Sequence, residues 1–162
     1  MTAINLQQFC AARHDVREYL HQPFVIDGHT YATDGRILVR VPGGGEDSDV
    51  PSKIVQSVRE MFAVKYAALG PLPESIPERV ECTDCHGSGV DDEDDACFAC
   101  SGTGESPQIV EIGASTFLAH FVRMIAALPN PLISVLSRVD PAAFVFDGGE
   151  GRVMPYIQRS ER

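Results

Sequence analysis

Four cysteines stand in two copies of one short pattern, C-x-x-C-x-G-x-G. The copies cover residues 82–89 and 97–104, and eleven residues separate Cys85 from Cys97. Zinc prefers four soft ligands in a tetrahedron, and two C-x-x-C turns brought face to face supply them. The spacing therefore predicts one zinc ion. Its four predicted ligands are Cys82, Cys85, Cys97 and Cys100.

Three other chemistries stay open for this segment. Residues 82–86 match the C-x-x-C-H pattern of haem attachment, although the second cysteine pair and the lack of an export signal favour a metal. Either C-x-x-C pair could be a redox dithiol, but one metal explains two matched pairs more simply. His86 could replace a cysteine as ligand, but beside four cysteines it is expected to be an exposed side chain. A shell of four thiolates leaves no open position for water, so we expect a structural zinc ion.

Five consecutive acidic residues lie between the two cysteine units. Such a run is most often a solvated, mobile tip, and it could also bind a basic partner. A calcium loop is not expected, because the run lacks the glycine and the distal glutamate of that motif. The candidate partner-binding residues are Asp91, Asp92, Glu93, Asp94 and Asp95.

Length and composition indicate a folded protein without a general affinity for phosphate. The chain has 162 residues with 44% hydrophobic and 22% charged content, as expected for one domain or one domain with a small insert. The formal net charge is −10, which disfavours nucleic acid as a partner because nucleic-acid binding depends on Lys and Arg. A protein partner is therefore the better expectation.

The apolar residues of the chain do not suggest a membrane protein. Residues 1–20 carry charges among their apolar residues, and no uninterrupted apolar stretch of about 18 residues occurs anywhere. We therefore expect a location in the reducing cytoplasm, where paired C-x-x-C units favour metal over disulfide. Cys10 stands apart from the other four cysteines and is expected to be a small core residue.

The first half of the chain predicts a helix, three strands and a second helix. The first helix is expected over residues 5–17, with Asn5 as its N-cap. Strands over 24–26, 29–33 and 36–41 are separated by two Asp-Gly turns. The second helix is expected over 52–69, where Gly-Pro follows.

The second half predicts a zinc-bound insert in an α+β core. Strands 79–81 and 108–112 are expected to pair and to lead into and out of the insert, residues 82–104. A helix over 115–128, with Ser115 as N-cap, is expected before three strands, 132–137, 142–146 and 152–157. The predicted fold is α+β, an antiparallel sheet with two or three helices plus a zinc-stapled β-hairpin. Its core combines residues 1–81 with residues 105–162.

The cysteine units resemble the zinc-binding repeat of J-domain co-chaperones, over residues 82–104 only. Those co-chaperones have four units and two zinc ions, whereas this chain has two units and room for one ion. The His-Pro-Asp tripeptide of a J-domain does not occur in the sequence. The resemblance therefore implies the metal and a surface for protein contacts, and not chaperone activity.

A second resemblance, to bacterial DNA polymerase sliding clamps, covers roughly two-thirds of the chain. Residues 31–38 read Y-A-T-D-G-R-I-L, which is similar to the A-T-D-G-h-R-L segment of these clamps. Residues 144–155 are similar to the clamp ending, in which a glycine turn joins two strands and Met-Pro follows. A clamp protomer has three such domains and this chain has one. The candidate ring-lining helices also carry few cations, Arg13, Arg17 and Arg123.

No catalytic motif stands out in the sequence, so we expect no enzyme. The leading hypothesis is a non-catalytic zinc-binding protein that acts through protein contacts. The clamp resemblance implies a link to DNA replication or its interference, in a phage or prophage setting. The alternatives are an oligomeric clamp-like module associated with DNA and a thiol-redox protein that uses one C-x-x-C pair.

Overall fold

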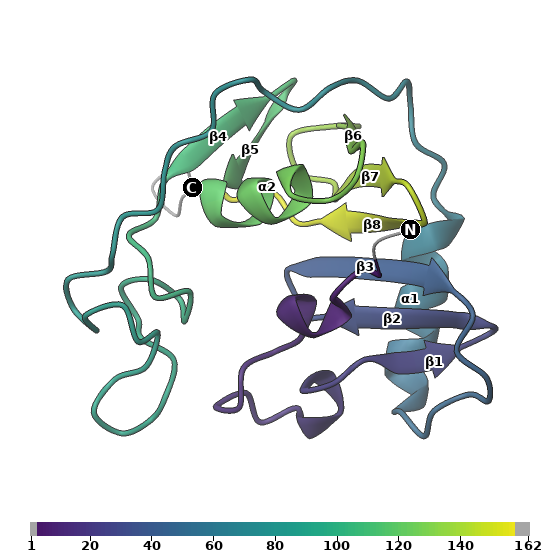
Figure 1. Cartoon of the computed structure of the whole chain (residues 1–162), viewed down its shortest axis with the longest axis horizontal. Helices are drawn as coiled ribbons and strands as arrows, with labels where there is room; N and C mark the ends of the chain where they lie inside the picture. Colours follow the sequence, from purple (N-terminus) through teal and green to yellow (C-terminus); the bar gives the residue numbers. More distant parts are fainter. Residues whose placement is uncertain (1–2, 158–162) are drawn as a thin grey trace.

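A six-stranded antiparallel sheet lies at the centre of the protein (Figure 1). The structure is a computed structural model that describes residues 3–157. It also contains two α-helices and a separate two-stranded sheet, so the predicted α+β class with an antiparallel sheet is confirmed. In spatial order the strands of the large sheet are β1 (Phe24–Ile26), β2 (His29–Thr33), β3 (Ile37–Pro42), β8 (Gly149–Val153), β7 (Ala142–Phe146) and β6 (Leu132–Ser134).

The two halves of the chain contribute equally to this sheet. Strands β1, β2 and β3 are consecutive and antiparallel, and so are β6, β7 and β8. The two groups meet where β3 pairs with β8, with Ile37 opposite Val153 and Arg40 opposite Glu150. Outward from this junction the strands follow in descending chain order on both sides, β3, β2 and β1 on one and β8, β7 and β6 on the other.

Asp-Gly pairs connect the strands as predicted. Asp27 and Gly28 both have positive φ, 51° and 75°, as a two-residue hairpin turn requires. In the turn between β2 and β3, the Asp34 carboxylate accepts hydrogen bonds from the backbone N–H groups of Arg36 and Ile37, at 2.8 and 3.1 Å. These side-chain contacts stabilise the turn locally.

Apolar side chains cover both faces of the large sheet. On one face, the 3₁₀ turn η1 (Leu6–Phe9) and helix α2 (Ala119–Ala126) pack in the main core. On the other face, helix α1 (Ser52–Ala63) packs on a second cluster (Figure 1). Strand β3 contributes to both clusters, because successive side chains of a strand point to opposite faces of the sheet. Ile37 and Val39 belong to the first cluster and Leu38 to the second.

The predicted helix over residues 5–17 is wrong. The structure has η1 and a second 3₁₀ turn, η2 (Glu18–Leu20), and Asn5 caps η1 by accepting a bond from the Gln7 N–H. The Asp15 carboxylate instead bonds the N–H and the guanidinium of Arg17. Such local side-chain bonds compete with helical ones, which explains why the apolar pattern does not extend into a helix.

The predicted helix over residues 115–128 begins too early. Residues Ser115–Leu118 form strand β5, which pairs with β4 (Ile109–Ile112), and helix α2 follows directly. The hairpin turns at Gly113, whose φ is 58°. The prediction that a strand over 79–81 pairs with 108–112 is therefore wrong, because β4 pairs with β5 and residue 81 makes only an isolated bridge with Glu105. Short apolar runs fit a strand as well as a helix, and Ser115 donates to the Arg138 carbonyl instead of capping a helix.

Two further elements were predicted too long at their C-terminal ends, and a third was predicted too late in the sequence. Helix α1 ends at Ala63, because Val64 has extended backbone and the buried Arg152 side chain donates to the Met61 and Val64 carbonyls. Strand β6 ends at Ser134, and β8 covers Gly149–Val153 rather than 152–157. The glycines that suggested a loop therefore lie within β8. The described residues contain no helix that is long and apolar enough to cross a membrane.

Backbone contacts cover both outer strands of the large sheet. Val25 of β1 bonds Ser48 through both its N–H and its carbonyl. Ile133 of β6 exchanges two backbone hydrogen bonds with Gly70, each at 2.8 Å. Unpaired edges invite strand addition, and these contacts obstruct it at both ends of the sheet.

The Gly151→Ala variant tests the packing at the junction of the two halves. A Cβ at Gly151 would overlap the Phe144 ring and the Leu38 carbonyl oxygen, so the free energy of unfolding should fall by about 1–3 kcal/mol. Denaturant unfolding measures this change. Gly70→Ala is the matched control, since a Cβ there has nothing within 4 Å. Equal stability of the two variants would contradict the packing described.

Candidate metal centre

The four cysteines predicted as ligands lie together. Their Sγ atoms are all within 4.8 Å of one another, and all four residues are at most 9% exposed. The Sγ distances are 4.0 Å from Cys82 to Cys97 and 3.8 Å from Cys85 to Cys100. A disulfide would need about 2.05 Å. Zinc–sulfur bonds of about 2.3 Å place the corners of a tetrahedron about 3.8 Å apart, so the four thiols could hold one metal ion of this size.

The two cysteine units have the same internal hydrogen bonds. In each unit the second glycine N–H donates to the sulfur of the second cysteine at 3.3 Å, from Gly89 to Cys85 and from Gly104 to Cys100. The first glycine N–H donates to the carbonyl of the first cysteine, at 3.1 and 3.2 Å. The repeated sequence thus folds into a repeated structure that presents sulfur atoms to one point.

Backbone contacts also join one unit to the other. The Cys82 N–H donates to the Gly104 carbonyl at 3.0 Å, and the Cys97 N–H donates to the Gly89 carbonyl at 2.9 Å. Gly89 and Gly104 have φ near 80°, and an added Cβ would lie 2.5–2.6 Å from a carbonyl oxygen of the other unit. Only glycine fits both conditions at these two positions.

The thiols of Cys85 and Cys97 have pKa values that are shifted in opposite directions. Burial raises the pKa of Cys85, but hydrogen bonds from the Gly89 N–H and the neighbouring thiols outweigh burial and lower this pKa to about 6. The backbone N–H of Cys100 lowers the pKa of Cys97, but burial and the bonds to neighbouring thiols raise it to about 11. A metal ion binds thiolates, so its binding must release the protons that remain.

The insert is not the regular β-hairpin that was predicted. It contains no helix or strand within residues 82–104, and isolated bridges pair Glu81 with Glu105 and Val90 with Ala96. The glycine-rich turns that present the sulfur atoms replace the expected ladder. The acidic run 91–95 lies beyond the second bridge, and all five of its residues are exposed. The structure does not bring these carboxylates to the cysteines.

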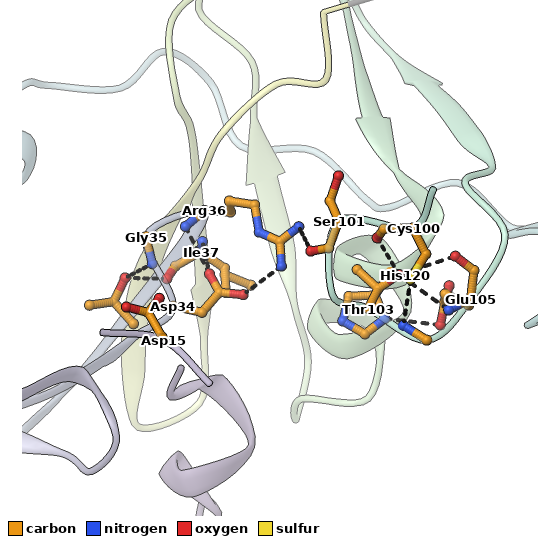
Figure 2. A network of polar contacts seen from close by, with 12 residues as sticks. Asp15, Asp34, Gly35, Arg36, Ile37, Cys100, Ser101, Thr103, Glu105 and His120 are labelled. Atoms are coloured by element: carbon orange, nitrogen blue, oxygen red, sulfur yellow. Dashed lines mark hydrogen bonds and ion pairs between the residues drawn. The ribbon is translucent and has the colours of Figure 1, made fainter. Parts of the chain in front are cut away.

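A buried carboxylate that sequence reasoning missed fixes the insert to the core. Glu105 is 5% exposed and follows the last glycine of the second unit. Figure 2 shows Glu105 beside His120. It accepts a bond from His120 at 2.9 Å, pairs closely with Arg123, and lies 3.6 Å from Arg79. Burial raises the pKa of Glu105, but the bonds from His120 and Arg123 keep it below its ordinary value. Nothing in the local sequence distinguishes this glutamate from an exposed one.

The turn between β2 and β3 makes a second contact with the insert. The Arg36 side chain donates to the Ser101 carbonyl at 3.1 Å and lies 3.5 Å from the Asp34 carboxylate (Figure 2). Its guanidinium is also 5.1 Å from the centre of the Phe121 ring. The segment that carries the clamp resemblance therefore touches the second cysteine unit.

A cavity of about 160 Å³ lies between α1 and the large sheet. Its apolar walls include Leu38 and Met154 from the sheet side and Val58 and Met61 from α1. It is also lined by three arginines, Arg17, Arg36 and Arg152. The two segments similar to sliding clamps both contribute to this cavity, although more than 100 residues of sequence separate Leu38 from Met154.

Comparison with protein-family models, with curated proteins and with solved structures finds no match for this chain. The resemblances to J-domain co-chaperones and to sliding clamps therefore stay predictions. The candidate site rests on the geometry of the cysteines and of the cavity.

Gly104→Ala tests whether the contact between the units supports metal binding. The added Cβ would lie 2.5 Å from the Gly87 carbonyl oxygen, so zinc affinity should fall roughly 10–100-fold, as for other groups that support metal ligands. Competition with a chromogenic chelator measures this affinity. Gly45→Ala is the matched control, because Gly45 has a similar φ of 83° and open space around it. An equal loss in both variants would point to backbone strain alone.

Proposed function

We propose that this protein is a non-catalytic zinc-binding protein that acts through contacts with other proteins. The observation that carries the proposal is the closed group of four buried thiols. Four thiolates complete the tetrahedral shell of zinc and leave no position for a substrate or an activated water. The metal therefore has a structural role in this proposal.

The zinc ion would supply the interior that the insert otherwise lacks. Within the described residues, the buried hydrophobic cluster of this segment consists of the four cysteines themselves. Binding of zinc to such a segment contributes directly to its folding free energy. The folded insert would then hold its contacts with the core at Glu105 and Arg36.

The apolar cavity beside α1 is the proposed contact site. Its volume of 160 Å³ is below the 300–1,000 Å³ or so that small-molecule sites usually have. It suits an apolar side chain of a partner peptide, while the guanidinium groups of Arg17 and Arg36 at its rim are held by Asp15 and Asp34. The exposed acidic run 91–95 is a second proposed contact, for a basic partner.

The proposed link to DNA replication, or to interference with it, rests on the resemblance to sliding clamps. Two features support that resemblance, namely the equal contribution of both halves to the sheet and the meeting of the two similar segments at one cavity. A phage or prophage protein that meets the replication machinery of a host is the setting we propose. The alternative is an oligomeric clamp-like module around DNA. The covered outer strands and the net charge of −10 weigh against this alternative.

Metal analysis of the purified protein tests the first part of the proposal. We expect one zinc ion per chain, and Cys97→Ser should lose it, because three thiolates leave the shell incomplete. Cys10→Ser is the control and should keep the metal, since Cys10 lies apart from the cluster. Inductively coupled plasma mass spectrometry provides the count. Two oxidisable dithiols and no bound metal would instead favour the redox alternative.

Affinity capture from cells of the native host tests the proposed contact site. The Met154→Asp variant places a charge in the cavity, so proteins retained by the original chain should be lost or reduced at least about tenfold. Leu132→Asp is the matched control, because Leu132 and Met154 are 39% and 41% exposed and Leu132 lies outside the cavity. Quantitative mass spectrometry compares the proteins captured by each variant with those captured by the original chain. Identical captured sets for both variants would rule out this cavity as the contact site.

A further inference from the structure

A second and larger cavity lies between the insert and the core. It has a volume of about 680 Å³ and separates the second cysteine unit from strand β5 and the end of the described chain. Its walls combine apolar and polar side chains and come from segments that are far apart in sequence. We call this cavity the knuckle groove. Its apolar residues include Phe98, Ala99, Pro107, Leu118, Tyr156 and Ile157.

Phe98 is the most prominent side chain of the knuckle groove. It is 92% exposed, although it is a large aromatic residue. It stands between the cysteines of the second unit, where the first unit has Thr83, so the fold of the unit does not require an aromatic residue there. Ile157, which also lines the groove, is 53% exposed. Exposed apolar residues gathered at a cavity mark an interaction surface more often than isolated ones do.

The segment that forms most of the knuckle groove carries charges of one sign, and the nearest arginines of the core, Arg36, Arg79 and Arg123, are bonded to the Ser101 carbonyl or to Glu105. Residues 80–122 include nine Asp and Glu residues and contain no Lys or Arg. Four thiolates around one zinc ion would add a net charge of about −2. Glu105, in the wall of the groove, is already paired with arginines of the core, and the other acidic residues of this stretch are exposed. A cationic ligand therefore complements this surface, and a nucleic acid does not.

We propose that the knuckle groove binds a basic segment of a partner protein. An apolar side chain of that segment packs against Phe98, and its Lys or Arg side chains face the surrounding carboxylates. Aromatic anchors of this kind commonly carry a large share of the binding energy, with charge adding specificity and rate of association. This inference rests on the proposed metal-held fold of the second cysteine unit, and it concerns a surface separate from the cavity beside α1.

Selection from a surface-displayed library of random peptides tests the inference with the full chain loaded with zinc. The peptides recovered should be rich in Lys and Arg and contain an apolar residue, and their affinity should fall as salt increases. Phe98→Ser should weaken binding about tenfold or more. Val139→Ser is the matched control, because Val139 is exposed and lies outside the groove. Zinc content, measured in every variant, separates failure of this inference from failure of the metal site.

Four outcomes would overturn the inference. They are a library without enrichment, enrichment of acidic or uncharged peptides, equal binding by Phe98→Ser and the original chain, and preferential binding of single-stranded DNA. A chain that ends at Ile157 adds a further check, because the sequence beyond it contains Arg159 and Arg162. If peptides bind only to this shortened chain, the groove is the site of the protein's own C-terminal residues and the proposed partner is excluded.

Discussion

The pairing of β3 with β8 is the interaction on which the arrangement of this protein depends. It joins two groups of three strands that are each locally connected, and it is the long-range step in forming the sheet. The ladder continues beyond the strands, since the Met154 N–H donates to the Arg36 carbonyl at 2.8 Å. This register brings the turn at Asp34 and Gly35, between β2 and β3, beside Met154 and Pro155. The cavity beside α1 exists because these two segments are neighbours.

The insert is stabilised in a different way from the core. The core buries large side chains such as Phe9, Phe117 and Phe144 on a sheet with a full ladder. The insert has only four cysteines to bury and no regular ladder. Its backbone bonds between the two units position the sulfur atoms, but four thiols offer little apolar area. A metal ion held by the four thiols would compensate for this small hydrophobic interior, as it does in other small metal-binding segments.

The sequence predicted the parts of this structure that depend on short-range chemistry. Asp-Gly turns located the hairpins, and cysteine spacing located the cluster, because both signals act within a few residues. Predictions from the sequence failed where contacts with residues far along the chain determine the local structure. The segment 115–118 becomes a strand because β4 pairs with it, and Gly151 fits within β8 because Phe144 and Leu38 approach closely. Glu105 could not be recognised, since its partners His120 and Arg123 are on a helix whose packing the sequence does not reveal.

The contacts of the insert connect the cysteine cluster to the core at two points. Arg36 lines the cavity beside α1 and donates to the Ser101 carbonyl, one residue after Cys100 of the cluster. Glu105 follows Gly104, whose N–H donates to the Cys100 sulfur, and it binds helix α2, whose Phe121 ring lies beside the Arg36 guanidinium. The second cysteine unit thus contacts both helix α2 and the turn between β2 and β3. A change in the fold of that unit would therefore alter the contacts of Arg36 and Glu105 together.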